Sequence, residues 1–243
     1  MNNKQIALVT GANKGIGLET ARQLAQQNII VLLGARDLVK GETAAGELRK
    51  EGHDVRAVEI DVSKSDSIGK AVAQVERDFG RLDILINNAG VLIDDYGKKV
   101  SEQALDTWRT TFQTNFFGLI ETTQAFLPLL RKSEAGRIVN LSSILGSITY
   151  HATPGSPVYD FKVPAYNVSK AAVNAYTVQL AYELKDSKIK VNAAHPGWVK
   201  TDLGGDGATM EIPDGAKTGV ALATIGEDGP NGAYLHMGET IPW

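Results

Sequence analysis

Short apolar runs rich in β-branched residues alternate with longer stretches of helical periodicity along this chain. The runs lie at residues 6–9, 29–33, 55–60, 82–86, 137–141 and 189–194, and the helical stretches at about 15–27, 38–50, 65–79, 102–130, 166–185 and 214–224. Nearly continuous apolar runs of this length are typical of strands that are covered on both faces. The alternation therefore predicts an α/β fold with a doubly wound parallel β-sheet flanked by helices on both faces.

The alternation continues through all 243 residues, with no low-complexity linker, repeat or block of charge. We therefore predict one domain, residues 1–243. Two segments interrupt the pattern locally. Residues 146–165 form an insert before the helix predicted at 166–185, and residues 197–213 are rich in glycine, which favours a mobile loop over a substrate site.

The composition argues against several classes of function. With 25 basic and 28 acidic residues the net charge is -3, which gives no field that attracts nucleic acid or an anionic membrane. The chain has no cysteine and no pair of histidines at metal-ligand spacing, so we expect no metal. Its first residues fit no signal peptide, and no apolar run approaches the ~18 residues of a membrane helix, so we expect a cytoplasmic protein.

A glycine-rich turn, TGANKGIG, follows the first predicted strand. Its order differs from that of a triphosphate-binding loop, because Lys14 precedes Gly15 and does not follow the last glycine. Gly11 ends the strand, while Gly15 and Gly17 open a helix whose N-terminal amides and dipole favour a pyrophosphate. The simpler alternative is a tight turn without a ligand. A dinucleotide at this position would make the domain one of the Rossmann type.

The end of the second predicted strand bears on the choice between NADP(H) and NAD(H). Arg36 lies where a basic side chain would accept the 2′-phosphate of NADP, and Lys14 supplies a second positive charge. Asp37 could instead bind the ribose hydroxyls of NAD, but we expect it to cap the helix that follows. Both cations could also be ordinary solvated side chains. The balance favours NADP(H).

Seven motifs in sequence order give this chain a strong resemblance to the short-chain dehydrogenase/reductase family. They are TGANKGIG at 10–17, Asp61–Val62, NNAG at 87–90, Asn115 in QTNFFG, VNLSSILG at 139–146, YNVSK at 166–170 and HPGWVKTDLGG at 195–205. Within the family the chain resembles the single-domain, carbonyl reductase-like group. The resemblance implies an enzyme that reduces aldehydes and ketones with NADPH, or oxidises the alcohols. Loops set the substrate, so the family does not identify it.

Tyr166 and Lys170 are four residues apart in a predicted helix, so both side chains share one face. An ammonium group close to a phenol lowers the phenol pKa, which would suit Tyr166 for general acid and base catalysis. The resemblance also implies that Lys170 and Tyr166 contact the coenzyme. A tyrosine and a lysine at this spacing are, however, common on ordinary amphipathic helices.

Two further residues complete the catalytic set that the resemblance implies. Ser143 matches the catalytic serine because Gly146 follows it at the family's distance, and its hydroxyl would hold the substrate carbonyl oxygen. Ser142 is the rival, and its simpler role is a bond to local backbone. Asn115 would bind a water that links Lys170 to solvent, or it could be a buried polar residue that kinks a helix.

The remaining coenzyme contacts come from the resemblance alone. They are Asn13 and Ile16 in the glycine turn, Asp61 and Val62 after the third strand, Asn88, Ala89 and Gly90 after the fourth, and Pro196, Gly197, Val199 and Thr201 after the sixth. We assign purely structural roles to Asn87 and Asn192.

The chain departs from the family between Ser143 and Tyr166, which are 23 positions apart, more than is usual. Within residues 149–163, four apolar side chains could line the substrate pocket or only cover the core: Tyr150, Val158, Tyr159 and Phe161. The chain could be a monomer or a homo-oligomer formed through the long and catalytic helices. An NAD-linked alcohol dehydrogenase and a non-catalytic dinucleotide sensor remain as alternative functions.

Overall fold

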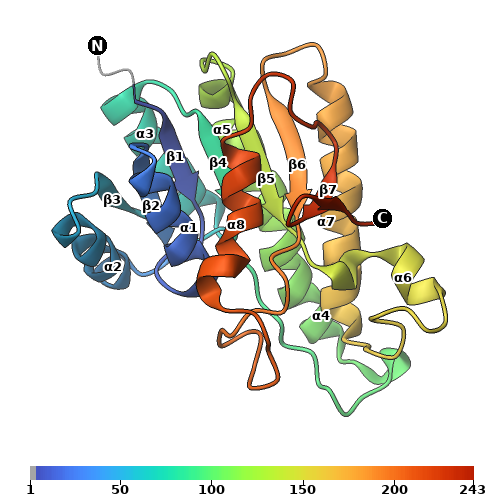
Figure 1. Ribbon diagram of the computed structural model, residues 1–243. Helices are drawn as coiled ribbons and strands as arrows, with labels where there is room; N and C mark the ends of the chain where they lie inside the picture. Colours follow the sequence, from blue (N-terminus) through green and yellow to red (C-terminus); the bar gives the residue numbers. More distant parts are fainter. Residues whose placement is uncertain (1–3) are drawn as a thin grey trace.

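The computed structural model describes residues 4–243, which form one eight-stranded sheet in the order β3-β2-β1-β4-β5-β6-β7-β8 (Figure 1). All neighbouring strands are parallel except β7 and β8, which form an antiparallel pair at one edge. The strands are β1 (Ile6–Val9), β2 (Ile30–Ala35), β3 (Val55–Glu59), β4 (Ile84–Asn87), β5 (Arg137–Leu141), β6 (Lys190–Ala194), β7 (Tyr234–His236) and β8 (Glu239–Thr240). The predicted parallel sheet is confirmed, whereas β7 and β8 were not predicted.

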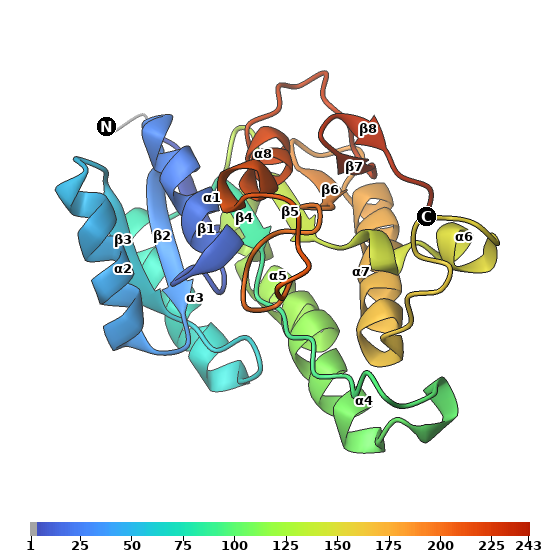
Figure 2. The same cartoon turned by 60° about the horizontal axis from the view of Figure 1, so that its bottom comes forward.

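Helices cover both faces of the sheet, as the apolar runs predicted. One layer holds α1 (Gly15–Gln26), α2 (Leu38–Lys50) and α8 (Ile212–Ala223), and the other holds α3 (Ser65–Phe79), α5 (Gly118–Leu130) and α7 (Pro164–Glu183) (Figure 2). Successive residues of β1 point to opposite faces, so Ala7 and Val9 pack in the first layer while Ile6 and Leu8 pack in the second. Both faces of the strand are therefore buried.

The helix predicted at 102–130 is wrong in its detail. A short 3-10 turn at Val100–Glu102 precedes α4 (Leu105–Phe112), a π-helical turn occupies Gln113–Phe117, and only then does α5 begin. The π turn inserts one extra residue per turn and is a frequent feature of functional sites.

The insert before the catalytic helix is shorter than predicted. Helix α7 begins at Pro164, two residues before Tyr166, because proline is well suited to the first helical position. The segment between β5 and α7 contains a 3-10 turn at Ile144–Gly146 and the five-residue helix α6 (Ile148–Ala152), which was not predicted. No long helix forms there, as the prolines indicated.

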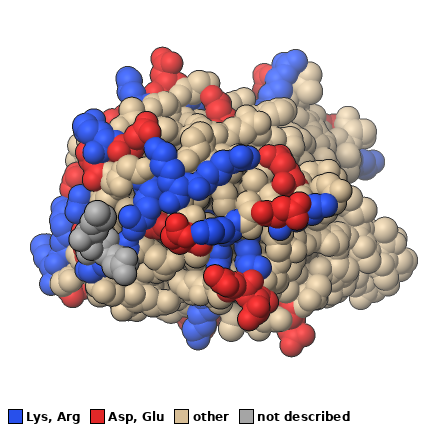
Figure 3. Space-filling view, turned by 90° about the horizontal axis from the view of Figure 1, so that it is seen from above, with Lys and Arg blue, Asp and Glu red and all other residues tan. Residues whose placement is uncertain are grey.

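Charged side chains of both signs are mixed over the face seen from above (Figure 3). Many charged side chains of the protein are paired, as Lys132 is with Glu76 and Arg131 is with Glu183. This face therefore presents no extended field of one sign. Within residues 4–243, no helix has the length and apolar character that crossing a membrane requires.

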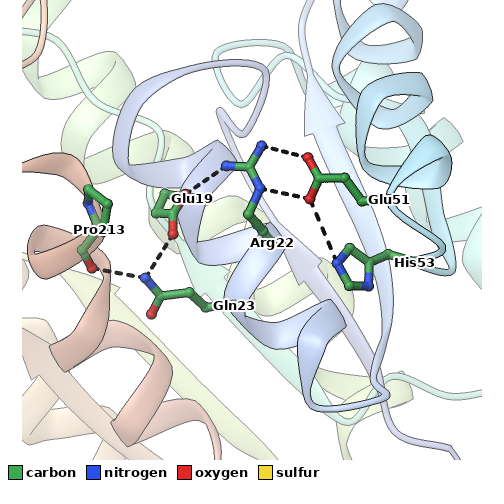
Figure 4. A network of polar contacts seen from close by, with 6 residues as sticks. All are labelled: Glu19, Arg22, Gln23, Glu51, His53 and Pro213. Atoms are coloured by element: carbon green, nitrogen blue, oxygen red, sulfur yellow. Dashed lines mark hydrogen bonds and ion pairs between the residues drawn. The ribbon is translucent and has the colours of Figure 1, made fainter.

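Polar side chains fix α1 against its neighbours (Figure 4). The guanidinium of Arg22 donates to Glu19 on its own helix at 2.8 Å and to both oxygens of Glu51, just after α2, at 3.1 Å. Gln23 donates to Glu19 and to the carbonyl of Pro213 in α8, each at 2.9 Å. These contacts hold the helix whose N-terminus faces the site described next.

Candidate active site

The carboxyl ends of β1, β4, β5 and β6 lie at one edge of the sheet, which is the lower edge in Figure 1 and comes forward in Figure 2. The strand order reverses between β1 and β4, and in doubly wound sheets such a switch point opens a crevice for ligands. The glycine turn follows β1 and Ser143 follows β5. The fold therefore brings the separate motifs of the sequence to a common edge.

The glycine turn has the geometry that a pyrophosphate requires. Gly11 and Gly15 have φ values of 63° and 57°, which favour glycine. A Cβ on Gly17 would lie 2.7 Å from the carbonyl oxygen of Gly11, so no larger residue fits there. No side chain in residues 4–243 caps the N-terminus of α1, and its amides remain available to an anion. Asn13 and Ile16 are half-buried in the same turn.

Asn88 braces this turn from the end of β4. Its Nδ2 donates to the carbonyl oxygens of Thr10 at 2.8 Å and Gly11 at 3.1 Å. In return the Thr10 hydroxyl accepts the backbone N–H groups of Asn88 and Ala89 at 3.0 and 3.1 Å. The shape of the turn thus depends on two strands, and Asn88 contributes to it through protein contacts.

The cations at this edge differ in their surroundings. Asp37 accepts the N–H of Lys40 at 3.1 Å, which confirms it as the cap of α2. Arg36 is exposed and makes no hydrogen bond or ion pair within residues 4–243. Lys14 forms an ion pair with Asp202, which belongs to the loop at 197–213. No sequence pattern predicts this partner for Lys14, because Asp202 is distant in the chain.

The loop at 197–213 approaches the glycine turn. A Cβ on Gly15 would lie 3.5 Å from the methyl group of Thr201. The loop starts with Gly197 at a φ of 93° and is held by a bridge between Val199 and Met210. Pro196, before it, is buried. Its contacts with the turn place this segment over the same edge as the other motifs.

Asp61 is engaged by the start of the next helix. Its Oδ1 accepts the N–H of Ser63 at 3.0 Å and the Ser63 hydroxyl at 2.6 Å. Partial burial raises its pKa, but these bonds and Lys64 outweigh the burial and lower it, so the group is a carboxylate at neutral pH. Val62 beside it is buried.

Tyr166 and Lys170 are both buried on α7. The Lys170 Nζ lies 5.6 Å from the centroid of the Tyr166 ring and donates to the carbonyl of Leu141 at 2.7 Å. Burial raises the pKa of Tyr166 to about 12, although a hydrogen bond with the Ser143 hydroxyl partly opposes this. Burial lowers the pKa of Lys170 to about 8. The expectation that the pKa of Tyr166 lies below its usual value is therefore wrong in this structure, because desolvation of the phenolate dominates.

The two candidate serines have different partners. The Ser142 hydroxyl donates to Asn174 at 2.6 Å inside the core, which is a structural contact. The Ser143 hydroxyl accepts the N–H of Leu145 at 3.2 Å and also reaches the Tyr166 hydroxyl. Ser143 is thus the serine that shares the site with Tyr166.

Asn115 lies in the π turn and is 1% exposed. Its Oδ1 accepts the N–H of Val91 at 2.8 Å, while its Nδ2 donates to the Val91 carbonyl at 2.9 Å and to Ser169 at 3.1 Å. The side chain therefore joins the segment after β4 to α7. A Cβ on Gly90 would lie 3.4 Å from Asn115 and 3.6 Å from the Lys170 Nζ. The water-binding role expected of the Asn115 amide stays a prediction.

Asp94 belongs to this site, although the sequence analysis did not select it. The carboxylate is 6% exposed and accepts the N–H of Ala165 at 2.7 Å and that of Tyr166 at 3.1 Å. It thus caps α7 at the turn that carries Tyr166. Asp94 and Tyr166 are separated by 72 residues, so no local pattern could reveal the contact.

Of the four apolar residues of the insert, Val158 and Tyr150 pack on the core, whereas Tyr159 and Phe161 contact side chains outside it. Val158 is buried, and Tyr150 packs on the small core of Ala193, Tyr234 and Ile241. The Tyr159 ring lies under Lys162, with the ammonium 5.2 Å from its centroid. Phe161, which is 45% exposed, lies 6.5 Å from the ring of Tyr96.

The two asparagines expected to be structural make core contacts. Asn87 donates to Thr123 and Asn140, each at 2.9 Å. Asn192 bonds to the backbone of Pro230 and Ala233 at 2.8 and 2.9 Å. Residues 4–243 contain no cluster of three or more His, Asp or Glu side chains that could hold a metal ion.

Comparison with known proteins defines the family. A family profile described as short chain dehydrogenase matches residues 5–211. The short-chain dehydrogenase/reductase 1 of Saponaria officinalis is 34% identical over 99% of this chain and 96% of its own length. The carbonyl reductase (NADPH) 1 of Mus musculus is 32% identical over 100% of this chain and 99% of its own. The NADPH-bound carbonyl reductase from chicken fatty liver superimposes with a TM-score of 0.85 at 30% identity, covering 99% of both chains.

The chain therefore belongs to the short-chain dehydrogenase family, a class of nicotinamide-dinucleotide oxidoreductases. Its likeness to the carbonyl reductase group, which the motifs indicated, is confirmed. The protein is an enzyme that acts on carbonyl and alcohol groups.

Proposed function

We propose that this protein is an NADPH-dependent carbonyl reductase in which Tyr166 is the general acid and base. The observation that carries the proposal is the convergence of the Ser143 hydroxyl, Tyr166 and Lys170 at the edge that also holds the uncapped glycine turn. The names of the mouse and chicken relatives, both NADPH carbonyl reductases, support it.

The chemistry divides between coenzyme and protein. Bound NADPH supplies the hydride, so the protein has to orient the carbonyl and provide a proton. Ser143 donates a hydrogen bond to the carbonyl oxygen, which stabilises negative charge as it develops there. Tyr166 remains protonated at neutral pH because its pKa is about 12, and it transfers its proton to the same oxygen.

Lys170 acts on the charge that this transfer leaves behind. With a pKa of about 8, its side chain is mostly an ammonium group at neutral pH. The ammonium stabilises the phenolate of Tyr166, because both groups are buried and solvent screens the attraction between their charges only weakly. Asn115 binds the backbone next to Gly90, and Gly90 lies beside the Lys170 ammonium. Asn115 thus helps to keep the ammonium close to the Tyr166 ring.

The residues of the glycine turn fit the dinucleotide. The amides at the start of α1 would hold its pyrophosphate, and the bare faces of Gly11 and Gly17 would allow close approach of the backbone. Arg36, exposed and without a protein partner in residues 4–243, would hold the 2′-phosphate, and Lys14 would supply a second positive charge if it left Asp202. The remaining family positions after β3, β4 and β6 line the adenine and nicotinamide ends.

A comparison of coenzymes tests this assignment. Steady-state rates with NADPH and NADH are measured against a panel of aromatic aldehydes and ketones for the wild type and Arg36→Ala. We expect a preference for NADPH, and a rise in its KM of about ten- to a hundredfold in the variant, since a charge-assisted hydrogen bond contributes about 1.5–3 kcal/mol. NADH kinetics should not change. Lys40→Ala, which removes an exposed cation of the adjacent helix, is the matched control.

Two results would reject parts of the proposal. Equal use of both coenzymes, with no effect of Arg36→Ala, would favour the NAD-linked alcohol dehydrogenase. Tight NADPH binding without turnover of any carbonyl would favour the non-catalytic sensor. We further infer that residues 1–243 act as one cytoplasmic domain, with 197–213 as the substrate loop; the choice between monomer and homo-oligomer stays a prediction.

A further inference from the structure

Two side chains hold the peptide group that links Ser143 to Ile144. The Tyr234 hydroxyl donates to the carbonyl oxygen of Ser143, and the N–H of Ile144 donates to Nδ1 of His195 at 3.2 Å. Because this carbonyl and this N–H belong to one planar unit, the two contacts fix the plane from both sides. Neither His195 nor Tyr234 has a role in the function proposed above.

Both side chains are anchored in the sheet. His195 directly follows β6, and its N–H donates to the carbonyl of Leu235 in β7 at 2.8 Å, which continues the pairing of the two strands. Tyr234 begins β7, is 1% exposed and stacks on Trp243 with a centroid separation of 5.2 Å. The hydroxyl and the imidazole are thus presented by a rigid edge, so that they can position what they bind.

His195 also contacts the substrate loop. Its Nδ1 accepts a second N–H, that of Gly197, at 3.3 Å. A ring nitrogen that accepts two N–H groups carries no proton, so the proton is assigned to Nε2. Burial, together with His236, lowers the pKa of His195 to about 3, and the ring is a neutral acceptor at neutral pH. The same atom therefore links the start of the 197–213 loop to the segment that carries Ser143.

The peptide plane matters because it restrains the backbone that carries the Ser143 side chain. Fixing the plane after Ser143 fixes rotation about its Cα–C bond, and with it the direction of the Cα–Cβ bond relative to the sheet. The backbone of Ser143 is extended, with φ and ψ of -158° and 148°, and its carbonyl also accepts the N–H of Gly146 at 2.7 Å in the 3-10 turn that follows. The bonds from Tyr234 and His195 add to this local turn a constraint that comes from the sheet.

We infer that His195 and Tyr234 are positioning residues that hold the Ser143 hydroxyl against the substrate carbonyl, and that His195 couples this alignment to the substrate loop. The inference depends on the catalytic role proposed for Ser143. Loss of the Tyr234 hydroxyl removes one of the two donors to the Ser143 carbonyl, and loss of His195 removes the acceptor of the Ile144 N–H. Either change lets the peptide plane, and with it the Ser143 hydroxyl, shift relative to Tyr166. A misplacement of a catalytic group by about 1 Å can lower the rate by about a hundredfold. We expect little effect on coenzyme binding, which takes place elsewhere.

The test is a double-mutant cycle between Tyr234→Phe and Ser143→Ala. Tyr234→Phe removes only the hydroxyl, and we expect kcat to fall about ten- to a hundredfold while the Kd of NADPH is unchanged. In the Ser143→Ala background the same substitution should have no further effect, because nothing remains to be positioned. Tyr176→Phe is the matched control, since Tyr176 lies farther along α7 and its hydroxyl bonds to Thr123 of α5.

Substitutions of His195 provide an independent arm. The Oδ1 of asparagine can take the place of Nδ1, so His195→Asn should keep most of kcat, whereas His195→Leu should lose as much as Tyr234→Phe. An unchanged kcat in Tyr234→Phe, or an equal loss in both backgrounds, would overturn the inference and leave the proposed function intact. Full activity in Ser143→Ala would reject the role of the serine, and the inference with it.

Discussion

Asp94 offers the sharpest test of how the fold supports its site. Its carboxylate accepts the N–H groups of Ala165 and Tyr166, at 2.7 and 3.1 Å, in the first turn of α7. Asp94→Asn preserves the volume but has one acceptor oxygen, and its amide NH2 then faces the second N–H. The substitution also removes a negative charge from the N-terminus of a 20-residue helix.

The magnitude follows from these contacts. Loss of one charge-assisted hydrogen bond costs about 1.5–3 kcal/mol, and the charge at the helix terminus contributes about 1 kcal/mol. A total of about 3 kcal/mol corresponds to a fall in Tm of about 6–12 °C for a chain of this size. Because one of the two donors is the N–H of Tyr166, kcat should fall as well.

Thermal unfolding followed by circular dichroism measures the stability change, with NADPH oxidation measured on the same preparations. Asp95→Asn is the matched control. The Asp95 carboxylate is next to Asp94 in the chain, but it is exposed and bonds within its own surface turn, to Gly97 at 3.1 Å and Lys98 at 3.2 Å. Its Tm should change far less. If Asp94→Asn has the Tm and kcat of the Asp95→Asn control, the cap does not hold Tyr166 and the reasoning is refuted.

Three further outcomes are expected. The kcat for carbonyl reduction should be constant below about pH 8 and fall above it. The reason is that Lys170, with its pKa of about 8, loses its charge as the pH rises. A pH-rate profile that stays flat to pH 10 would contradict this. Arg137→Met should lower the free energy of unfolding by about 2–4 kcal/mol in urea titrations. The buried guanidinium donates to the carbonyls of Ile225 and Gly226 at 2.8 and 3.2 Å, and the Ile225 carbonyl would lose its partner. An unchanged urea midpoint would exclude this cost. Asp202→Asn should lower the KM of NADPH about two- to fivefold without affecting NADH, because it releases Lys14 for the 2′-phosphate; an equal change for both coenzymes would argue against a phosphate contact.

The sequence predicted the layers of the fold because their cause is local. Ile6 to Val9 are apolar on both faces of a strand, and α2 spans the predicted residues 38–50 because Asp37 caps it. The turn at Gly11 was recognised for a similar reason, since only glycine adopts its backbone easily.

What the sequence missed depends on contacts between distant residues. The π turn contains Asn115, whose side chain bonds to the backbone of Val91, 24 positions away. Strands β7 and β8 are too short, and too mixed in polarity, to stand out from their surroundings. The pKa of Tyr166 could not be given the right direction because burial is a property of the packed site. Tyr234 reaches Ser143 across 91 residues, a separation that no motif covers.

The central claim is that Tyr166 gives the proton in carbonyl reduction. The most direct test is the single-turnover rate of NADPH oxidation with an aromatic ketone for Tyr166→Phe, with the Kd of NADPH determined by fluorescence titration. The account predicts an unchanged Kd and a rate lower by about a hundred- to ten-thousandfold, since only the acid is removed. A variant that binds NADPH normally and retains more than a tenth of the wild-type rate would contradict it.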